Sequence, residues 1–145
     1  DAFCPASAIE AAEVTPVASR DELFEKCDIV SLHIPATDET RNSINYDVVT
    51  KLPKNGILIN TARKEVIDEE GLIKALAERE DLKYIADIAP ERAAEFAEKF
   101  PGRYFATPKK MGAQTKEANI NAGIAAACQI VGFLKDGITK FQVNK

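Results

Sequence analysis

The chain has 145 residues, of which 46% are hydrophobic and 29% are charged, and its net charge is −4 at pH 7. These values indicate one soluble globular domain with a sizeable core, and the acidic balance argues against nucleic acid as a partner because it supplies no basic field. No run approaches the roughly 20 apolar residues of a membrane helix, and the first residues do not form a signal peptide.

The few cysteine, histidine and methionine residues indicate the cellular compartment and exclude some kinds of site. Cys4, Cys27 and Cys128 are odd in number and lack a CxxC pair, which argues against a zinc site or a disulfide framework and favours a reducing cytoplasm. His33 is the only histidine, so a multi-histidine metal site is excluded and we expect no metal. The only methionine is Met111 and none begins the chain, so we expect a fragment of a longer protein.

Strands and helices are predicted to alternate, after a first stretch of 16 residues without a firm period. Ser19 is the expected N-cap of a short helix over 20–26, with Glu22 completing a capping box. Residues 27–34, CDIVSLHI, form a near-continuous apolar run that is typical of a strand buried on both faces. The later elements are a short helix within 45–51, a strand over 56–60, a helix over 68–78, a strand over 82–88, a helix over 90–100, a strand over 103–107 and a long helix from 115 to 135 that ends near Gly137.

This alternation predicts an α/β fold, a parallel sheet with helices on both faces. The carboxyl ends of parallel strands emerge along one edge, where ligands bind in open α/β sheets. One cleft is therefore expected to collect polar side chains from several strand ends. The residues at the ends of the four predicted strands are His33 and Pro35, then Thr61, Ala62 and Arg63, then Asp87, and last Lys109 and Lys110.

Arg63 and Asp87 each have two interpretations from sequence alone. The guanidinium of Arg63 offers a rigid fork of donors that suits a carboxylate or a phosphate, but a surface arginine that caps a helix or pairs with Glu65 fits equally well. Asp87 is either a turn or cap residue, or an acceptor for an amide or hydroxyl of a bound ligand.

Lys109 and Lys110 are either a solvated pair or part of the site. Gly112 allows the backbone to approach closely just after them, and a lysine in a cleft can donate a proton or stabilise a developing oxyanion. His33, inside an apolar run, is expected to be a core histidine rather than a catalyst. No glycine precedes Gly56, so a GxGxxG phosphate loop is absent from this chain.

Four motifs follow one another in a fixed order. They are Ser31 to Pro35 with Thr37 to Arg41, Ile59 to Arg63 with Val66 to Glu69, Ala86–Asp87, and Thr107–Pro108 with Gly112 to Thr115. Together they resemble the D-isomer-specific 2-hydroxyacid dehydrogenases over nearly the whole chain. The run from 107 to 132 looks most like the branch that acts on a phosphorylated hydroxy acid and has lysine at the position of the usual histidine.

The resemblance implies a Rossmann-like domain that lacks its first βαβ part, with NAD as cofactor and a small 2-hydroxy acid as substrate. It implies that Arg63 binds the substrate carboxylate and carbonyl and that Asp1 holds the adenosine ribose. It also implies that residues 1–115 belong to the NAD-binding domain, while 116–145 return toward a substrate domain and help to build a homodimer. The cofactor-lining positions carried over are Asp1, Ile34, Pro35, Thr40, Thr61, Ala62, Arg63, Asp87 and Gly112.

The chain departs from the family pattern at the catalytic positions. The family usually has a histidine two residues before the glycine that matches Gly112, and this chain has Lys110 there, or Lys109 when the count starts from the preceding proline. The glutamate that pairs with that histidine is replaced by Arg92, with Glu91 one residue early. A lysine needs no carboxylate to fix a tautomer, so the two changes are consistent with each other.

Lys64 replaces the common glycine after the arginine. From the resemblance the catalytic candidates are Arg63, Lys110 or Lys109, and Glu91. Two alternatives stay open, namely a glyoxylate or hydroxypyruvate reductase of the same family and a non-catalytic, NAD-sensing interaction protein on the same fold.

Overall fold

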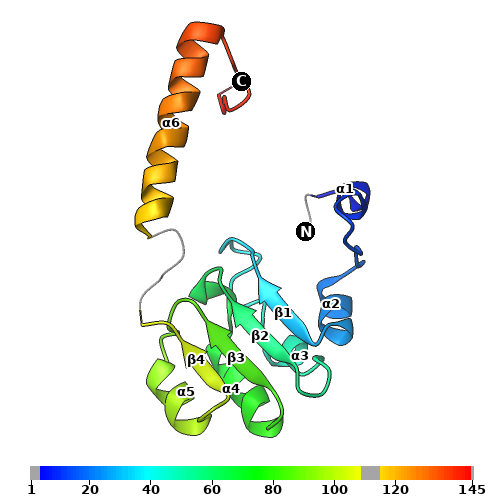
Figure 1. The fold of residues 1–145 in the computed structure, drawn as a ribbon. Helices are drawn as coiled ribbons and strands as arrows, with labels where there is room; N and C mark the ends of the chain where they lie inside the picture. Colours follow the sequence, from blue (N-terminus) through cyan, green and yellow to red (C-terminus); the bar gives the residue numbers. More distant parts are fainter. Residues whose placement is uncertain (1–3, 109–114, 145) are drawn as a thin grey trace. The chain divides into compact units, whose positions relative to one another are not determined.

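The computed structural model describes residues 4–108 and 115–144, and the chain divides into two compact units, 1–109 and 110–145. Within the described residues four strands form one parallel sheet in the order β1-β2-β3-β4 (Figure 1). This confirms the parallel sheet predicted from the alternation. The elements are α1 (Ala6–Ala11), α2 (Arg20–Lys26), β1 (Ile29–Leu32), α3 (Tyr46–Val49), β2 (Ile57–Asn60), the 3-10 turn η1 (Lys64–Val66), α4 (Glu69–Glu78), β3 (Lys83–Ala86), α5 (Ala93–Lys99), β4 (Tyr104–Ala106) and α6 (Lys116–Asp136).

The predicted helix starts carry the capping bonds that their sequences indicate. Ser19 Oγ accepts the Glu22 N–H at 3.1 Å, and the Glu22 carboxylate accepts the Ala18 N–H at 2.8 Å. The return bond of the capping box thus reaches one residue earlier than predicted. Thr115 caps α6 in the same way, and Gly137 ends that helix in the left-handed conformation at φ 65°. The short helix α1 and the turn η1 were not predicted.

The sheet has one buried and one open face. Ile29 is 58% exposed and Phe105 is 60% exposed, while Val30 lies in the core. The prediction that the strand within 27–34 is buried on both faces is therefore wrong for β1, where burial alternates because the core of the described helices covers only one side. The core beneath the sheet includes Phe24, Val30, Leu32, Val48, Val49, Leu58, Leu72, Leu76, Tyr84, Ala86 and Phe96.

Aromatic rings hold α5 against the last two strands. The ring centroids of Phe96 and Tyr84 are 5.6 Å apart, and those of Phe96 and Tyr104 are 5.2 Å apart. Such pairs contribute about 0.5–1.5 kcal/mol each beyond the area that they bury. They fix α5 on β3 and β4, and with it the loop between β3 and α5 at the carboxyl edge of the sheet.

An arginine closes the loops at the amino end of the sheet. Arg79, which follows α4, donates to both carboxylate oxygens of Asp81 at 2.8 and 2.7 Å. It also donates to the carbonyls of Thr50, Leu52 and Pro53 at 3.1–3.2 Å. The guanidinium beside it holds the pKa of Asp81 well below its usual range. These bonds join the segment before β2 to the segment before β3.

The second unit contains α6, which has 21 residues and none of them buried. Its exposed apolar residues include Ile124, Ile130 and Leu134. Across the described ranges, no helix combines the length and the apolar character needed to cross a membrane. The predicted return of residues 116–145 toward a substrate domain stays a prediction.

Candidate functional site

The ends of the first three strands meet at one edge. Leu32, Asn60 and Ala86 are neighbours across β1, β2 and β3, so the residues after them also lie side by side. The Thr61 hydroxyl donates to the Leu32 carbonyl at 3.2 Å, and the Asp87 N–H donates to the Asn60 carbonyl at 2.9 Å. The predicted convergence of polar side chains is thus found for these three strand ends.

His33 takes part in this edge rather than in the core. Its side chain is exposed, and its ring nitrogens lie 2.9 Å from Ser31 Oγ and 3.5 Å from Thr61 Oγ1. The expectation of a core histidine is therefore wrong. The reason is that His33 is the residue after β1, on the side of the strand where Ser31 and Ile29 are also exposed.

A tight turn after β2 presents Arg63. Asn60 Oδ1 accepts the Ala62 N–H and Asn60 Nδ2 donates to the Arg63 carbonyl, each at 3.0 Å. Arg63 itself is extended, at φ −134° and ψ 143°, and it precedes η1 in the N-cap position without a capping bond from its side chain. Sequence reasoning missed Asn60, although a polar residue two positions after the inward-facing Leu58 was a usable signal.

The guanidinium of Arg63 has donors to spare. Among the described residues it donates only to the carbonyl of Ala62, at 3.2 Å, and it forms no ion pair with Glu65. Its side chain is exposed at the edge of the sheet. A group with five donors and one such bond is available to an anionic ligand.

The loop after β1 is closed by hydroxyl bonds. Thr40 Oγ1 donates to the Pro35 carbonyl at 2.6 Å and accepts the Thr37 N–H at 2.8 Å. Ile34 is half-buried against the core. The structure therefore brings Pro35 and Thr40 together, although they are five positions apart in the chain.

Thr107, which directly follows β4, holds Asp87 in place. The Thr107 hydroxyl donates to the main-chain carbonyl of Asp87 and to its Oδ1, the latter at 3.3 Å, while the Thr107 N–H donates to the Ala86 carbonyl at 3.0 Å. Asp87 is half-buried. The carboxylate thus has a fixed place beside the ends of β2 and β4.

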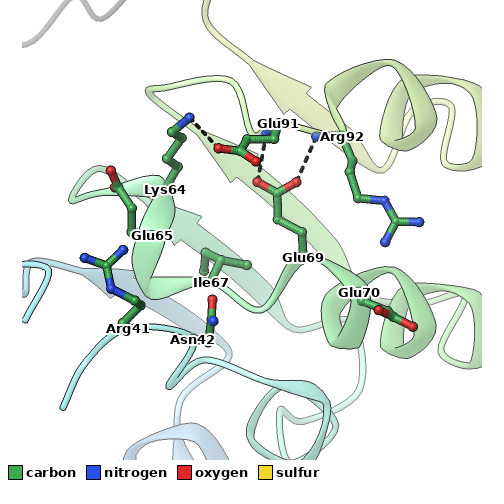
Figure 2. A pocket seen from close by; sticks show the side chains of 9 residues that line it. All are labelled: Arg41, Asn42, Lys64, Glu65, Ile67, Glu69, Glu70, Glu91 and Arg92. Carbon is green, nitrogen blue, oxygen red and sulfur yellow. Dashed lines mark hydrogen bonds and ion pairs between the residues drawn. The ribbon is translucent and has the colours of Figure 1, made fainter. Parts of the chain in front are cut away.

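A pocket of about 350 Å³ lies next to this edge. Figure 2 shows Glu69 pointing toward the loop after β3, where its carboxylate accepts the N–H groups of Glu91 and Arg92 at 2.8 Å each. Lys64 Nζ lies 2.8 Å from Glu91 Oε1. The lining consists of Arg41, Asn42, Lys64, Glu65, Ile67, Glu69, Glu70, Glu91 and Arg92.

Two departures from the family pattern thus meet in one ion pair. The hydrogen bond from Lys64 lowers the pKa of Glu91, and the same bond raises the pKa of Lys64. The Arg92 side chain turns to Glu95 instead, at 2.7 Å. The pair links the turn after β2 to the loop after β3, on either side of the pocket.

Four of the predicted site residues, Asp1, Lys109, Lys110 and Gly112, lie outside the described residues. The described part of the edge offers hydroxyls, an imidazole, a carboxylate and a guanidinium. Such a set can bind a ligand that carries an amide or hydroxyl donor together with an anionic group.

Comparison with known proteins gives a consistent result. The NAD-binding domain of the D-isomer-specific 2-hydroxyacid dehydrogenases matches residues 3–108. The chain is 36% identical to D-3-phosphoglycerate dehydrogenase of Haemophilus influenzae over 134 residues, which are 88% of this chain and 32% of that protein. It is 53% identical to glyoxylate reductase of Thermofilum pendens over 58 residues, which are 40% of this chain and 17% of that protein.

A solved structure matches the chain over its whole length. It is 3-phosphoglycerate dehydrogenase of Entamoeba histolytica with NAD+ bound, at a TM-score of 0.80 and 52% identity, covering 100% of this chain and 45% of that one. The match confirms the predicted Rossmann-like fold. The chain spans about a third of the length of the Haemophilus influenzae protein and less than half of the solved one.

Proposed function

The chain belongs to the D-isomer-specific 2-hydroxyacid dehydrogenases, whose NAD-binding domain matches its residues 3–108, and we propose that it serves the oxidation of 3-phosphoglycerate in a longer protein. C2 of the substrate loses a hydride to NAD and its hydroxyl loses a proton, which gives 3-phosphohydroxypyruvate, a precursor for serine. The observation that carries the reaction class is that the Arg63 guanidinium donates to only one carbonyl among the described residues, at the sheet edge where Thr61 and Asp87 also follow their strands. The substrate rests on the 52% identity to a phosphoglycerate dehydrogenase over the whole chain.

In this proposal Arg63 binds the substrate and polarises the bond that reacts. Its guanidinium holds the carboxylate of 3-phosphoglycerate and donates to the C2 oxygen, where negative charge grows as the hydroxyl proton leaves. Because the side chain is exposed and bonded only to Ala62 among the described residues, no internal partner has to be displaced first.

The other residues of the edge bind and orient the cofactor. NAD supplies the hydride acceptor, while the protein orients it and excludes water. Asp87 would accept from the carboxamide of a bound nicotinamide, and Thr61 and Ala62 would contribute to the nicotinamide side of the site. Ile34, Pro35 and Thr40 would line the rest of the cofactor site, and Asp1 would hold the adenosine ribose.

Lys110, or Lys109 in its place, exchanges the proton of the C2 hydroxyl. A lysine has an ordinary pKa of about 10.4, so it is a ready acid for reduction and becomes a base for oxidation only where its site lowers that pKa. The test is Lys110→Ala and Lys109→Ala in the longer dehydrogenase, each assayed for turnover. Unchanged turnover in both variants would contradict the lysine assignment.

Reduction of glyoxylate or hydroxypyruvate is the second candidate, favoured by the 53% identity to a glyoxylate reductase. The two functions differ in whether the substrate carries a phosphate. Turnover measured with 3-phosphoglycerate and with glyoxylate separates them. A kcat/KM higher for glyoxylate would replace the first proposal by the second.

The longer protein is proposed to be a cytoplasmic homodimer, with α6 at the subunit interface. The 145-residue chain by itself is expected to bind NAD weakly, since no glycine-rich phosphate loop precedes Gly56. Titration calorimetry measures this directly. A micromolar dissociation constant for the chain alone would contradict the expectation.

A further inference from the structure

We propose that Asn60 is a positioning residue of the dehydrogenase, whose buried side-chain amide fixes the main chain of Ala62 and Arg63 so that the guanidinium of Arg63 stands ready at the edge of the sheet. This inference rests on the proposed function, because it gives Asn60 its role through the substrate-binding arginine.

The burial of Asn60 calls for an explanation. Asn60 is 4% exposed, and it is the only polar or charged residue that is buried among those that the structure describes. It occupies an inward position of β2, in line with Leu58 and between the buried Leu32 and Ala86 of the neighbouring strands. An apolar side chain would fit the pattern there. Burying an amide is unfavourable unless its donor and acceptor both find partners.

Both ends of the amide are used on the same short turn. Asn60 Oδ1 accepts the Ala62 N–H and Asn60 Nδ2 donates to the Arg63 carbonyl, each at 3.0 Å. Making both bonds requires a side chain that carries a donor and an acceptor on the same carbon, as an amide does. Aspartate keeps the acceptor and loses the donor, and alanine loses both.

The strand of Asn60 is itself anchored in the core. On β3, which pairs with β2, the Tyr84 ring packs against Phe96 and Tyr104 at centroid distances of 5.6 and 5.9 Å. The main-chain carbonyl of Asn60 accepts the Asp87 N–H at 2.9 Å. The turn that carries Arg63 is therefore held through Asn60 by the rigid part of the fold.

Arg63 depends on this support because its own side chain has little. Its guanidinium bonds only the Ala62 carbonyl within the described ranges, so the position of the guanidinium follows from the position of the turn. Displacement of a substrate-orienting group by about 1 Å lowers the rate by roughly 100-fold. Loss of the two hydrogen bonds from the Asn60 side chain is expected to lower the rate by a similar factor.

A merely structural role makes a different prediction. If Asn60 only stabilised the fold, its replacement would reduce the amount of active enzyme, which lowers the apparent kcat and leaves both KM values unchanged. A positioning role raises the KM for the hydroxy acid and lowers kcat, while the KM for NAD stays within about twofold because the bond between the Asn60 and Asp87 main chains survives the change.

The test compares Asn60→Asp and Asn60→Ala in the longer dehydrogenase with the unchanged enzyme. Both variants are expected to show roughly 100-fold lower kcat/KM for the hydroxy acid. The matched control is Asn45→Asp, because Asn45 caps α3 through its acceptor oxygen alone, at 3.2 Å from the Val48 nitrogen, and aspartate keeps that bond. If the buried charge of Asn60→Asp prevents folding, seen by circular dichroism, Asn60→Ala carries the test.

A double variant decides whether Asn60 acts through Arg63. In an Arg63→Ala background, Asn60→Ala is expected to lower kcat/KM by less than about threefold more, because the group that it positions is already gone. Losses that multiply, or an unchanged KM for the hydroxy acid in the single variants, would overturn the positioning role alone. An unchanged enzyme without turnover on any 2-hydroxy or 2-oxo acid would overturn the proposed function, and this inference with it.

Discussion

Two arginines, one at each end of the sheet, show how differently the same side chain is used. Arg79, at the amino end, donates to three main-chain carbonyls and to both oxygens of Asp81. Arg63, at the carboxyl end, donates to one neighbouring carbonyl among the described residues. The difference separates an arginine that completes the fold from one whose donors remain for a ligand.

The support of the two side chains differs in the same way. Around Arg79 the guanidinium itself holds the surrounding loops together. Around Arg63 the side-chain amide of Asn60 holds the turn. The guanidinium itself makes one hydrogen bond among the described residues, to the Ala62 carbonyl. Removal of Arg79 should therefore affect stability, and removal of Arg63 should affect catalysis.

The largest expected effect is that of Arg63→Ala in the longer dehydrogenase. It should lower kcat/KM for the hydroxy acid by about 1,000-fold, which corresponds to about 4 kcal/mol of transition-state stabilisation. The thermal midpoint should change little, since the side chain is exposed and makes one bond to its neighbour. Steady-state kinetics and thermal unfolding measure both quantities.

Arg63→Lys is the matched control, because it keeps the charge and removes the planar fork of donors. It should recover only part of the activity. A kcat/KM for Arg63→Ala within about threefold of the unchanged enzyme would show that this guanidinium does not serve the reaction.

Arg79→Ala should have the largest effect on stability. It removes five hydrogen bonds and leaves Asp81 without its cation, so the free energy of unfolding should fall by about 3 kcal/mol. Urea unfolding of the 145-residue chain, followed by circular dichroism, measures the loss. A loss below about 0.5 kcal/mol, typical of exposed surface substitutions, would contradict the structural role.

Asp81→Asn tests the same cluster through pH. The bond from Arg79 holds the pKa of Asp81 below its ordinary value of 3.8, so the folded state binds this proton less readily than the unfolded one. The stabilisation is fully present above the ordinary pKa and is lost as pH falls toward the folded value. At neutral pH the substitution should lower the free energy of unfolding by about 2 kcal/mol.

The pH dependence supplies the control for that substitution. Below the ordinary pKa of 3.8 the unchanged chain should lose stability more steeply with falling pH than the Asp81→Asn chain, and the two stabilities should approach each other there. Parallel curves over this range would show that Asp81 does not contribute through its charge.

The smallest expected effect is on the exposed ion pair beside the pocket. Because Lys64 lowers the pKa of Glu91, Lys64→Ala should return that pKa toward its ordinary range. A pH titration followed by NMR of the Glu91 carboxyl group measures the shift, and Lys74→Ala, on the exposed side of α4, is the matched control. An unchanged pKa of Glu91 would show that the ion pair between Lys64 and Glu91 does not form in solution.

Local signals in the sequence located most of the elements. Ser19 caps the helix that it was expected to cap, and Asp68 and Thr115, where two further helices were expected to begin, also prove to be N-caps, because capping depends on residues only three positions apart. The arginine after the second strand was likewise placed correctly. Two expectations were wrong, namely burial on both faces of β1 and a core position for His33. Both depend on which elements cover the second face of the sheet, and a run of apolar residues does not specify that.

The sequence alone determined the order of strands and helices, the position of Arg63 after a strand, and the resemblance to a dehydrogenase family. The tertiary structure decided that Arg79 uses its donors within the fold while Arg63 makes one bond among the described residues, which strand residues are buried, and that Lys64 forms an ion pair with Glu91 beside the pocket. It also gave Asn60 its role, since a polar residue at the end of an apolar strand acquires meaning only when its partners are known. The physical reason is that caps and periodicity depend on near neighbours in the chain, whereas the Lys64–Glu91 pair joins residues 27 positions apart and the bonds of Arg79 to the Thr50 and Leu52 carbonyls span 29 and 27.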